Sequence, residues 1–280
     1  MLSFLGVLLS SLTLFFGAPF LRVLWSRFGS LPYWLAGFAF LPVFIFMGGS
    51  WAGAVWILVG VFSELESRGI RWIWSGLTSL SVSSGVLAGG AFYWLSTQKL
   101  TTLTSIAEEI HKLLKNSQFW QLPTIDQMVN LLQVLPGLVV AGLILTLAHA
   151  LIFEKVVYQF LAAPRERFAG QVRLLEFKLP DIFVWIAMVS FLGSFLTWPG
   201  KPVAENLFII CVALFLLQGV AILECFFNAI RAHWFVRALG YFLFVFQLFV
   251  ALAFIGFIDF WMDFRDRFRK MKSNTQTTGM

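Results

Sequence analysis

The sequence predicts an all-α membrane protein, a bundle of seven or eight transmembrane helices with amphipathic helices at its surface. Of the 280 residues, 59% are hydrophobic and only 12% are charged, and the mean hydropathy is +0.85. An ordinary globular domain is about a quarter charged, so these few charges could not cover a water-soluble fold. The sequence also contains a series of apolar runs, several of them about 17–25 residues long, the length that crosses a bilayer.

Eight apolar runs are candidate spans. The first has no basic region before it and no clear small-x-small site after it, so we expect a retained helix and not a signal peptide. The third, about 13 residues long, is too short to cross an average bilayer upright. It is a half-helix, a re-entrant segment or a span extended through Glu64. The approximate borders of the eight runs are Leu2–Leu24, Pro32–Gly48, Trp51–Ser63, Trp72–Leu95, Leu135–Phe153, Ile182–Trp198, Leu207–Phe227 and Tyr241–Trp261.

An amphipathic insertion at 97–133 separates the fourth run from the fifth. Apolar residues between Leu100 and Leu114 recur at helical spacing, with charged residues on the other side. After Pro123, the segment from Thr124 to Gln127 predicts a capping box, in which each residue hydrogen-bonds the other's backbone N–H. We expect two short amphipathic helices in the plane of the membrane interface; a lid or a docking surface is the alternative.

The remaining polar stretches are a charged loop at 154–181 and the C-terminal tail. Pro180 and Asp181 suit a helix start, because a carboxylate there meets the positive end of the helix dipole. Phe257 to Met271 is again amphipathic, so the last span should continue as a helix into the headgroup layer. We expect a single integral membrane domain at 1–272 and a disordered tail at 273–280.

The net charge of +6 is attributed to lipid headgroups and not to nucleic acid. The basic residues fall in short loops and at the C-terminus, where anionic lipids and the positive-inside bias explain them. Eight spans would place about eleven of the 20 Lys and Arg on one side and about nine on the other. This balance does not fix an orientation, and only the basic tail favours a cytoplasmic C-terminus.

Glu224 is the strongest candidate for a functional residue, because ionisable groups inside a span are costly. Asn228, four residues later, shares its helical face, Gln218 points away, and Asn206 opens the same helix. The alternative is a carboxylate near the interface, or one bonded to a neighbouring helix for assembly.

Other polar groups carry weaker hypotheses. Asp259, the pair Glu64 and Glu66, and His149 are more simply interfacial or packed residues. In the fourth run, Gly85-x-x-x-Gly89 favours close packing of another helix, and the nearby serines could instead line a polar cavity. The glycine pair is therefore a predicted helix-packing site.

The sequence contains no motif of a soluble enzyme. It has no Walker A loop, dinucleotide GxGxxG after a strand, HExxH, CxxC or GxSxG. The three histidines are scattered, and Cys211 and Cys225 are expected to be small buried hydrophobes. We therefore expect no catalytic activity, no cofactor and no bound metal ion.

Short motifs in the second half carry a family resemblance. They are Glu176-Phe177-Lys178-Leu179-Pro180-Asp181 leading to Trp185, then Asn206, then Leu217-Gln218-Gly219, and last Gly256-Phe257-Ile258-Asp259-Phe260-Trp261-Met262-Asp263-Phe264-Arg265. On these residues, about the last 110 of the chain resemble the YybS-like bacterial membrane proteins, which have a domain of unknown function. That family is distantly similar to the substrate-binding subunits of energy-coupling-factor transporters.

The resemblance implies binding or transport of a small solute at the cell inner (plasma) membrane by a multi-pass protein. The candidate binding residues are Glu224, Gln218, Asn206, Asp259, Asp263 and Arg265. The rival hypothesis is a scaffold or assembly subunit, whose small-residue helix and amphipathic segment bind a membrane protein partner. In both, the lipid bilayer is a partner.

Overall fold

The described part of the chain is helical throughout. The computed structural model describes residues 17–46, 50–98, 100, 102–115, 123–160, 177–230 and 232–268, which form helices, turns and short connections without a strand. The predicted all-α class is therefore confirmed. The chain divides into two compact units, Met1–Gln171 and Val172–Met280, with the boundary inside the loop predicted at 154–181. The single integral domain stays a prediction, and the predicted tail at 273–280 lies outside the described residues.

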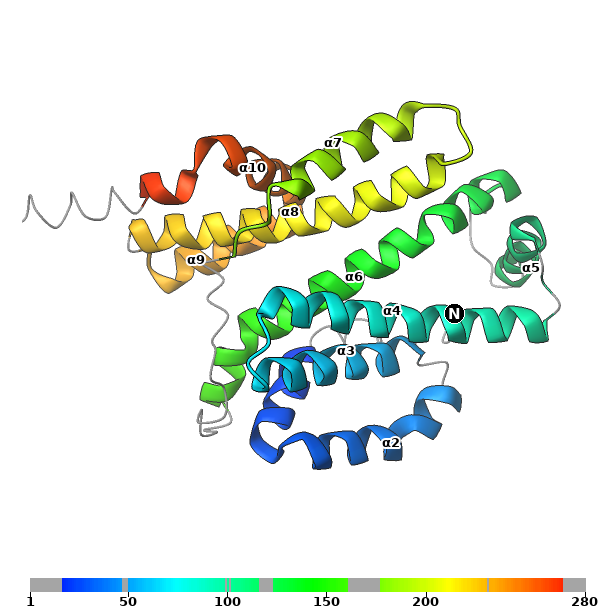
Figure 1. Cartoon of the computed structure of the whole chain (residues 1–280), viewed down its shortest axis with the longest axis horizontal. Coiled ribbons are helices and arrows are strands. Elements are labelled where there is room, and N and C mark those ends of the chain that lie inside the picture. The colour runs from blue at the N-terminus through cyan, green and yellow to red at the C-terminus, as the bar shows by residue number, and fades with distance from the viewer. Residues whose placement is uncertain are drawn as a thin grey trace, which may run out of the picture. The chain divides into compact units, whose positions relative to one another are not determined.

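The first unit is built around one buried helix. Residues 17–28 are helical and lead into α2 (Ser30–Phe46), α3 (Ser50–Ser67), α4 (Trp72–Thr97), α5 (Leu103–Lys115) and α6 (Ile125–Phe160), shown in Figure 1. α3 packs against α2, α4 and α6. Ala54, Val55, Leu58 and Val59 on α3 are fully buried, so this helix is the core of the unit.

The third apolar run forms a longer helix than its hydropathy suggested. α3 has 18 residues and continues past Glu64 to Ser67, so the helix is extended as one alternative expected, but it is not among the described helices apolar enough to cross a membrane. Gly69, at φ +78°, ends it. Gly69 N–H donates to Glu66 O (2.9 Å) and Ile70 N–H to Leu65 O (3.1 Å), the paired hydrogen bonds of a Schellman cap.

The amphipathic insertion is partly as predicted. Its first half is helix α5, and the capping box at the start of α6 is confirmed. Thr124 N–H donates to Gln127 Oε1 (2.9 Å) and Gln127 N–H to Thr124 Oγ1 (3.3 Å). The second short helix does not exist by itself, because α6 runs without interruption from Ile125 through Pro136 to Phe160. A proline removes one helical hydrogen bond, and apolar helices tolerate this when neighbouring groups satisfy the freed carbonyl.

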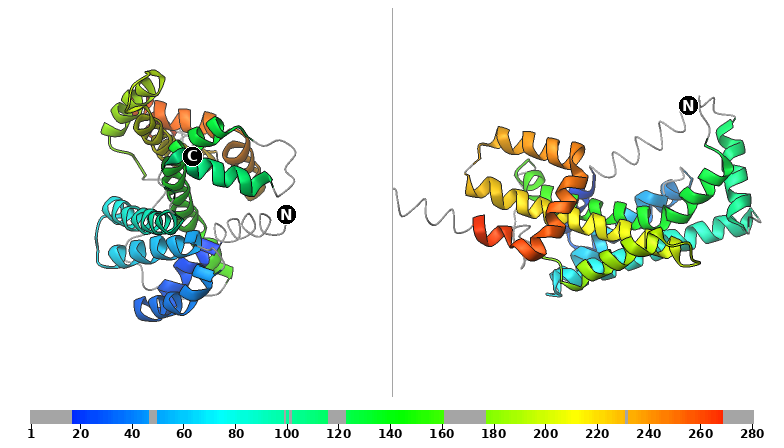
Figure 2. Two further views of the ribbon diagram at one scale, coloured as in Figure 1. Left: turned by 90° about the vertical axis from the view of Figure 1, so that its right-hand side faces the viewer. Right: turned by 90° about the horizontal axis from the view of Figure 1, so that it is seen from above.

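The second unit is centred on a long helix, α8. Its helices are α7 (Ile182–Phe195), α8 (Lys201–Ala229), α9 (Trp234–Tyr241), the π-helix η2 (Phe242–Gln247) and α10 (Phe249–Met262), seen in Figures 1 and 2. α7 and α10 both pack against α8. Two glycines mark the crossing of α8 and α10. A Cβ at Gly219 would collide with the carbonyl of Leu252, and one at Gly256 with the carbonyl of Phe215.

The last apolar run is not the single straight span that we expected. α9 ends at Tyr241, the π-turn follows, and α10 begins only after Leu248. The helix also does not continue unbroken into the tail. Asp263 adopts a left-handed conformation (φ 42°) at the end of α10, and a separate helical turn covers residues 264–268. The run fails as one span because the π-helix η2 separates α9 from α10, a break that hydropathy does not report.

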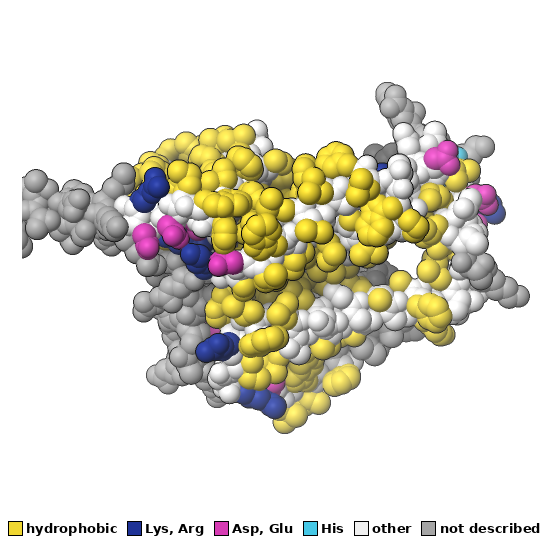
Figure 3. All heavy atoms as spheres, turned by 45° about the horizontal axis from the view of Figure 1, so that its top comes forward, with side chains coloured by type: hydrophobic (Ala, Val, Ile, Leu, Met, Phe, Trp, Pro, Cys, Tyr) yellow, Lys and Arg dark blue, Asp and Glu magenta, His cyan; other side chains and the backbone are white. Residues whose placement is uncertain are grey.

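Two described helices are long and apolar enough to cross a membrane, Ile125–Glu154 and Lys201–Ala229. Two shorter apolar helices are Ile182–Phe195 and Phe249–Met262. The expected seven or eight spans are therefore not confirmed among the described residues, and residues 2–16 of the first run lie outside them. On the face shown in Figure 3, hydrophobic side chains cover much of the described surface. Large apolar side chains of α7, among them Trp185, Val189 and Phe195, are exposed.

Candidate functional site

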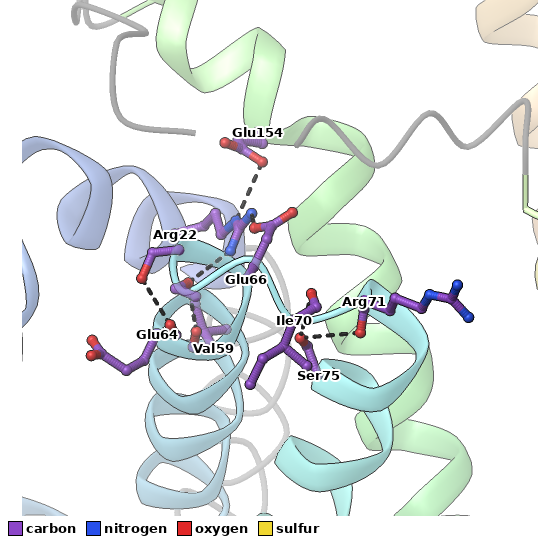
Figure 4. Close-up of polar contacts among 10 residues, drawn as sticks. Arg22, Val59, Glu64, Glu66, Ile70, Arg71, Ser75 and Glu154 are labelled. Carbon is purple, nitrogen blue, oxygen red and sulfur yellow. Dashed lines mark hydrogen bonds and ion pairs between the residues drawn. The ribbon is translucent and has the colours of Figure 1, made fainter. Parts of the chain in front are cut away.

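Among the described residues, the fold fixes three clusters of polar side chains that we consider in turn, one in the first unit and two in the second. The first, the Arg22 cluster, comprises Arg22, Ser63, Glu66 and Glu154. The Arg22 guanidinium donates to Ser63 Oγ (2.8 Å), to Glu66 Oε2 and to Glu154 Oε2 (3.3 Å). Figure 4 shows Arg22 between Glu66 of α3 and Glu154 of α6. The cluster thus joins the helix at 17–28, α3 and α6 around one buried cation.

Sequence reasoning missed this cluster. Arg22 lies inside the run Leu2–Leu24, where an ionisable group at membrane depth is costly and needs a partner. Its side chain is 2% exposed and its guanidinium lies 5.1 Å from the ring centroid of Phe62. A buried arginine requires a carboxylate partner. A search for acids at the ends of other apolar runs would have suggested Glu66 and Glu154.

Neighbouring charges lie outside the Arg22 cluster. Figure 4 shows the Glu64 and Arg71 side chains directed away from it. The pKa of Glu64, beyond the apolar part of α3, is lowered because Arg68 donates hydrogen bonds of 3.1 and 2.7 Å to Glu64 Oε1, with a smaller contribution from a hydrogen bond with Ser30. Glu64 and Glu66, although two residues apart, therefore have different cationic partners.

The second cluster, the Asp259 cluster, comprises Gln218 of α8, Asp259 of α10 and Arg265. Gln218 Nε2 donates to Asp259 Oδ2 (3.2 Å), Phe264 N–H donates to Asp259 Oδ1 (2.9 Å), and Arg265 Nε lies 3.5 Å from Asp259 Oδ2. Gln218 Oε1 accepts from Leu179 N–H (3.1 Å). Gln218, Asp259 and Arg265 are all buried. The Asp259 carboxylate therefore lies near the end of α10 and accepts from the first residue of the helical turn at 264–268. Gln218 connects it to Leu179, in the segment before α7.

Four of the six predicted binding residues lie in or beside the Asp259 cluster. Gln218, Asp259 and Arg265 form it, and Asp263 lies at its edge, where it accepts from Lys178 Nζ at 3.1 Å. The motif segments around residues 178, 218 and 259 thus meet at the crossing of Gly219 and Gly256. The separations of 39 and 41 residues explain why no local pattern predicted this meeting.

The third cluster, the Glu224 cluster, comprises Glu224, Asn228, Arg237 and Tyr241. Glu224 Oε1 accepts from Arg237 Nη1 (2.9 Å) and Asn228 Nδ2 (3.2 Å), and Glu224 Oε2 accepts from the Tyr241 hydroxyl (2.5 Å). Arg237 also donates to Asn228 Oδ1 (2.7 Å) and to Ala232 O (3.1 Å). The cluster joins the C-terminal part of α8 to α9.

Asn228 was predicted to share a helical face with Glu224, and Gln218 to point elsewhere. Both predictions are confirmed, because Asn228 bonds Glu224 and Gln218 bonds Asp259. Sequence reasoning missed Arg237 and Tyr241. The available signal was a carboxylate in an apolar helix, followed 13 and 17 residues later by an arginine and a tyrosine. These two residues are four apart on α9 and so share a helical face. Asn206 joins neither cluster in unit two, and its Nδ2 donates to Pro202 O (2.6 Å) in its own helix.

The predicted packing glycines do not contact another described helix. A Cβ at Gly85 or Gly89 would meet no described atom within 4 Å, and both residues are exposed. The buried face of α4 carries Ser75, Ser79 and Ser83. Contact of the two glycines with a helix of another molecule stays a prediction.

Solvent access distinguishes the clusters of the second unit. The side chains of Asp259 and Arg265 are 2% and 9% exposed, whereas those of Glu224 and Arg237 are 21% and 30% exposed. Within the described residues, no three His, Cys, Asp or Glu side chains are grouped so that they could hold a metal ion. The Glu224 cluster is therefore more accessible than the Asp259 cluster.

A helical chain with two apolar helices of spanning length, exposed apolar side chains and buried ion pairs has the features of a helical membrane protein. The chain belongs to the family described as Predicted membrane protein (DUF2232), which matches residues 1–260. The predicted membrane character agrees with this family description. No curated protein and no solved structure matches the chain.

Proposed function

We propose that this chain is a multi-pass protein of the bacterial inner membrane that binds or transports a small solute through the Glu224 cluster. The observation that carries the proposal is the partial exposure of the Glu224–Arg237 ion pair. The Asp259 carboxylate in the same unit is enclosed. Ionisable groups at membrane depth are costly, so an accessible pair suggests a ligand site. The resemblance to YybS-like proteins and to energy-coupling-factor subunits agrees with this function by analogy only.

The structure also suggests how the site changes between empty and occupied states. Arg237 reaches Glu224 from a separate helix, α9, which the π-turn connects to α10. Discontinuous helices often form the substrate sites of transporters. Exchange of an internal hydrogen bond for one to a solute would alter how α9 is held to α8.

A thermal-shift screen of the detergent-purified chain tests the proposal. A binding solute raises the unfolding temperature of the wild type, and Glu224→Gln should reduce that rise. Glu205→Gln is the matched control, because Glu205 lies on the same helix in a partly exposed pair with Lys201 (3.7 Å). A solute that stabilises wild type and Glu224→Gln equally would place the binding site elsewhere.

The exposed glycine face of α4 supports a second candidate function, a scaffold subunit that holds a membrane protein partner. Small residues on a lipid-facing helix allow close approach of another helix. Gentle detergent extraction should then recover a stoichiometric partner that Gly85→Leu or Gly89→Leu releases. Gly76→Leu is the control, because no described atom lies within 4 Å of its Cβ position either and it points to the opposite side of α4. A single, partner-free species would count against this alternative.

A further inference from the structure

One end of the first unit carries three exposed arginines, Arg27, Arg68 and Arg71. Ser30 and Arg68 both hydrogen-bond the Glu64 side chain, so the start of α2 lies beside the end of α3. Arg27 comes three residues before Ser30, and Arg71 follows Arg68 across the turn from α3 to α4. We call these three arginines the basic end of the unit.

Large apolar side chains are exposed next to these arginines in the chain. Phe28, Ile70 and Trp74 are 54%, 40% and 61% exposed, and the Arg27 guanidinium lies 5.6 Å from the ring centroid of Phe28. Cations mixed with exposed aromatic and aliphatic groups suit the headgroup layer of a membrane, where the apolar groups enter the lipid and the cations meet phosphates.

The Arg22 cluster brings the end of α6 to the same place. Arg22 holds Glu66 of α3 and Glu154 of α6, and Glu66 lies two residues before Arg68. Glu154 is the last residue of the segment Ile125–Glu154, which is long and apolar enough to cross a membrane. That segment therefore ends at the basic end. Up to the boundary of the first unit, the sequence that follows adds Lys155, Arg165 and Arg167.

The other end of the same segment has fewer cations. Its first residue, Ile125, is 30 residues from its last, a length of about 45 Å at 1.5 Å per residue. The chain between α4 and α6 leads to this end, and its cations are Lys99, Lys112 and Lys115. Six cations at the basic end thus stand against three at the opposite end.

We propose that the basic end is the cytoplasmic docking surface of the first unit, and that its partner is the anionic phospholipid headgroups of that leaflet. Lys and Arg close to the ends of spans favour the cytoplasmic side, and anionic headgroups attract them. The orientation that the sequence left open is thereby assigned for this unit. The inference rests on the membrane location in the proposed function and not on the Glu224 cluster.

Cysteine labelling of the full chain in membranes tests the orientation. Cys211→Ala and Cys225→Ala supply a background without cysteine, and Ser67 and Asp126 are exposed positions at the two ends. A membrane-impermeant maleimide should label Ser67→Cys in inverted vesicles and Asp126→Cys in intact spheroplasts. The reverse pattern, or labelling of both variants from the same side, overturns the inference.

Lipid titration of the detergent-purified chain tests the partner. Dihexanoyl phosphatidylglycerol should raise the unfolding temperature at lower concentrations than dihexanoyl phosphatidylcholine, which is zwitterionic. Combining Arg68→Gln with Arg71→Gln should raise the half-maximal phosphatidylglycerol concentration on the order of tenfold. Lys112→Gln is the control, because Lys112 is exposed at the opposite end.

Two results of this titration overturn the inference: equal shifts with the two lipids, or an equal loss in the Lys112→Gln control. Neither result changes the comparison of solute binding between wild type and Glu224→Gln. The docking surface can therefore fail while the proposed function stands, and the reverse also holds.

Discussion

The Asp259 and Glu224 clusters use the same helix, α8, in opposite ways. Gln218 and Glu224 are six residues apart, so they point to different sides. Gln218 faces the crossing with α10, where two glycines bring the backbones together and exclude solvent. Glu224 faces α9 near the end of α8, where its partners remain partly exposed. The carboxylate at the tight crossing is therefore enclosed, whereas the carboxylate near the end of α8 is partly exposed.

Among substitutions that test this comparison, Asp259→Ala should cause the largest loss in the free energy of unfolding. The substitution leaves Arg265 buried without its carboxylate and Gln218 without its acceptor, at a cost of about 3–5 kcal/mol in the free energy of unfolding. Thermal unfolding in detergent measures the loss. Asp181→Ala is the control, because Asp181 is exposed and its side chain makes no capping hydrogen bond. The double variant Asp259→Ala with Arg265→Leu should recover part of the loss; additive losses would contradict the pairing.

The glycine crossing should give the second effect. Gly256→Ala places a methyl group against the carbonyl of Phe215, and because backbone must move, the expected loss is about 1–3 kcal/mol. The unfolding temperature should fall relative to Gly85→Ala, whose added methyl meets no described atom within 4 Å. Equal unfolding temperatures for the two variants would show that α8 and α10 do not pack this closely.

Tyr241→Phe should have a smaller effect at the accessible cluster. It removes one hydrogen bond to Glu224, whose carboxylate keeps the donors Arg237 and Asn228, so we expect a loss of about 1.5 kcal/mol. Tyr93→Phe is the control, since Tyr93 is 72% exposed. A loss as large as that of Asp259→Ala would mean that the Glu224 cluster is equally structural, which would remove the contrast.

The smallest effect is expected for Lys178→Ala. Lys178 and Asp263 form an ion pair with half-exposed side chains, and such pairs contribute about 0–1 kcal/mol. The unfolding temperatures of variant and wild type should converge as salt is raised, because salt screens exposed charges. A salt-independent loss would instead show that this pair is part of the enclosed network.

Features encoded over a few residues were predictable from the sequence. The capping box of Thr124 and Gln127 requires only a turn of helix, and α5 follows from its apolar spacing. The helical class follows from composition. The helix breaks at η2 and Asp263 were not predictable, because they depend on how the chain packs around α8 and not on hydropathy.

The candidate site was predictable only as a set of residue types. Glu224 stands out as a lone acid in an apolar run, and Asn228 follows from helical periodicity. The partners of Asp259 come from sequence positions 41 residues away or from beyond a left-handed residue, so no spacing rule brings them together. Arg22 shows the converse: its position within an apolar run was visible, but its acids lie 44 and 132 residues away.

The length of α6 has a mechanical consequence. Its 36 residues extend about 54 Å at 1.5 Å per residue, whereas the hydrocarbon core of a bilayer is about 30 Å thick. A large part of the helix must therefore stand outside the hydrocarbon, and α5 packs against it, beside its capped end (Figure 1). α6 therefore links α5 at its capped end to Glu154 near its opposite end, where Arg22 holds it, and Pro136 between them is the expected point of bending.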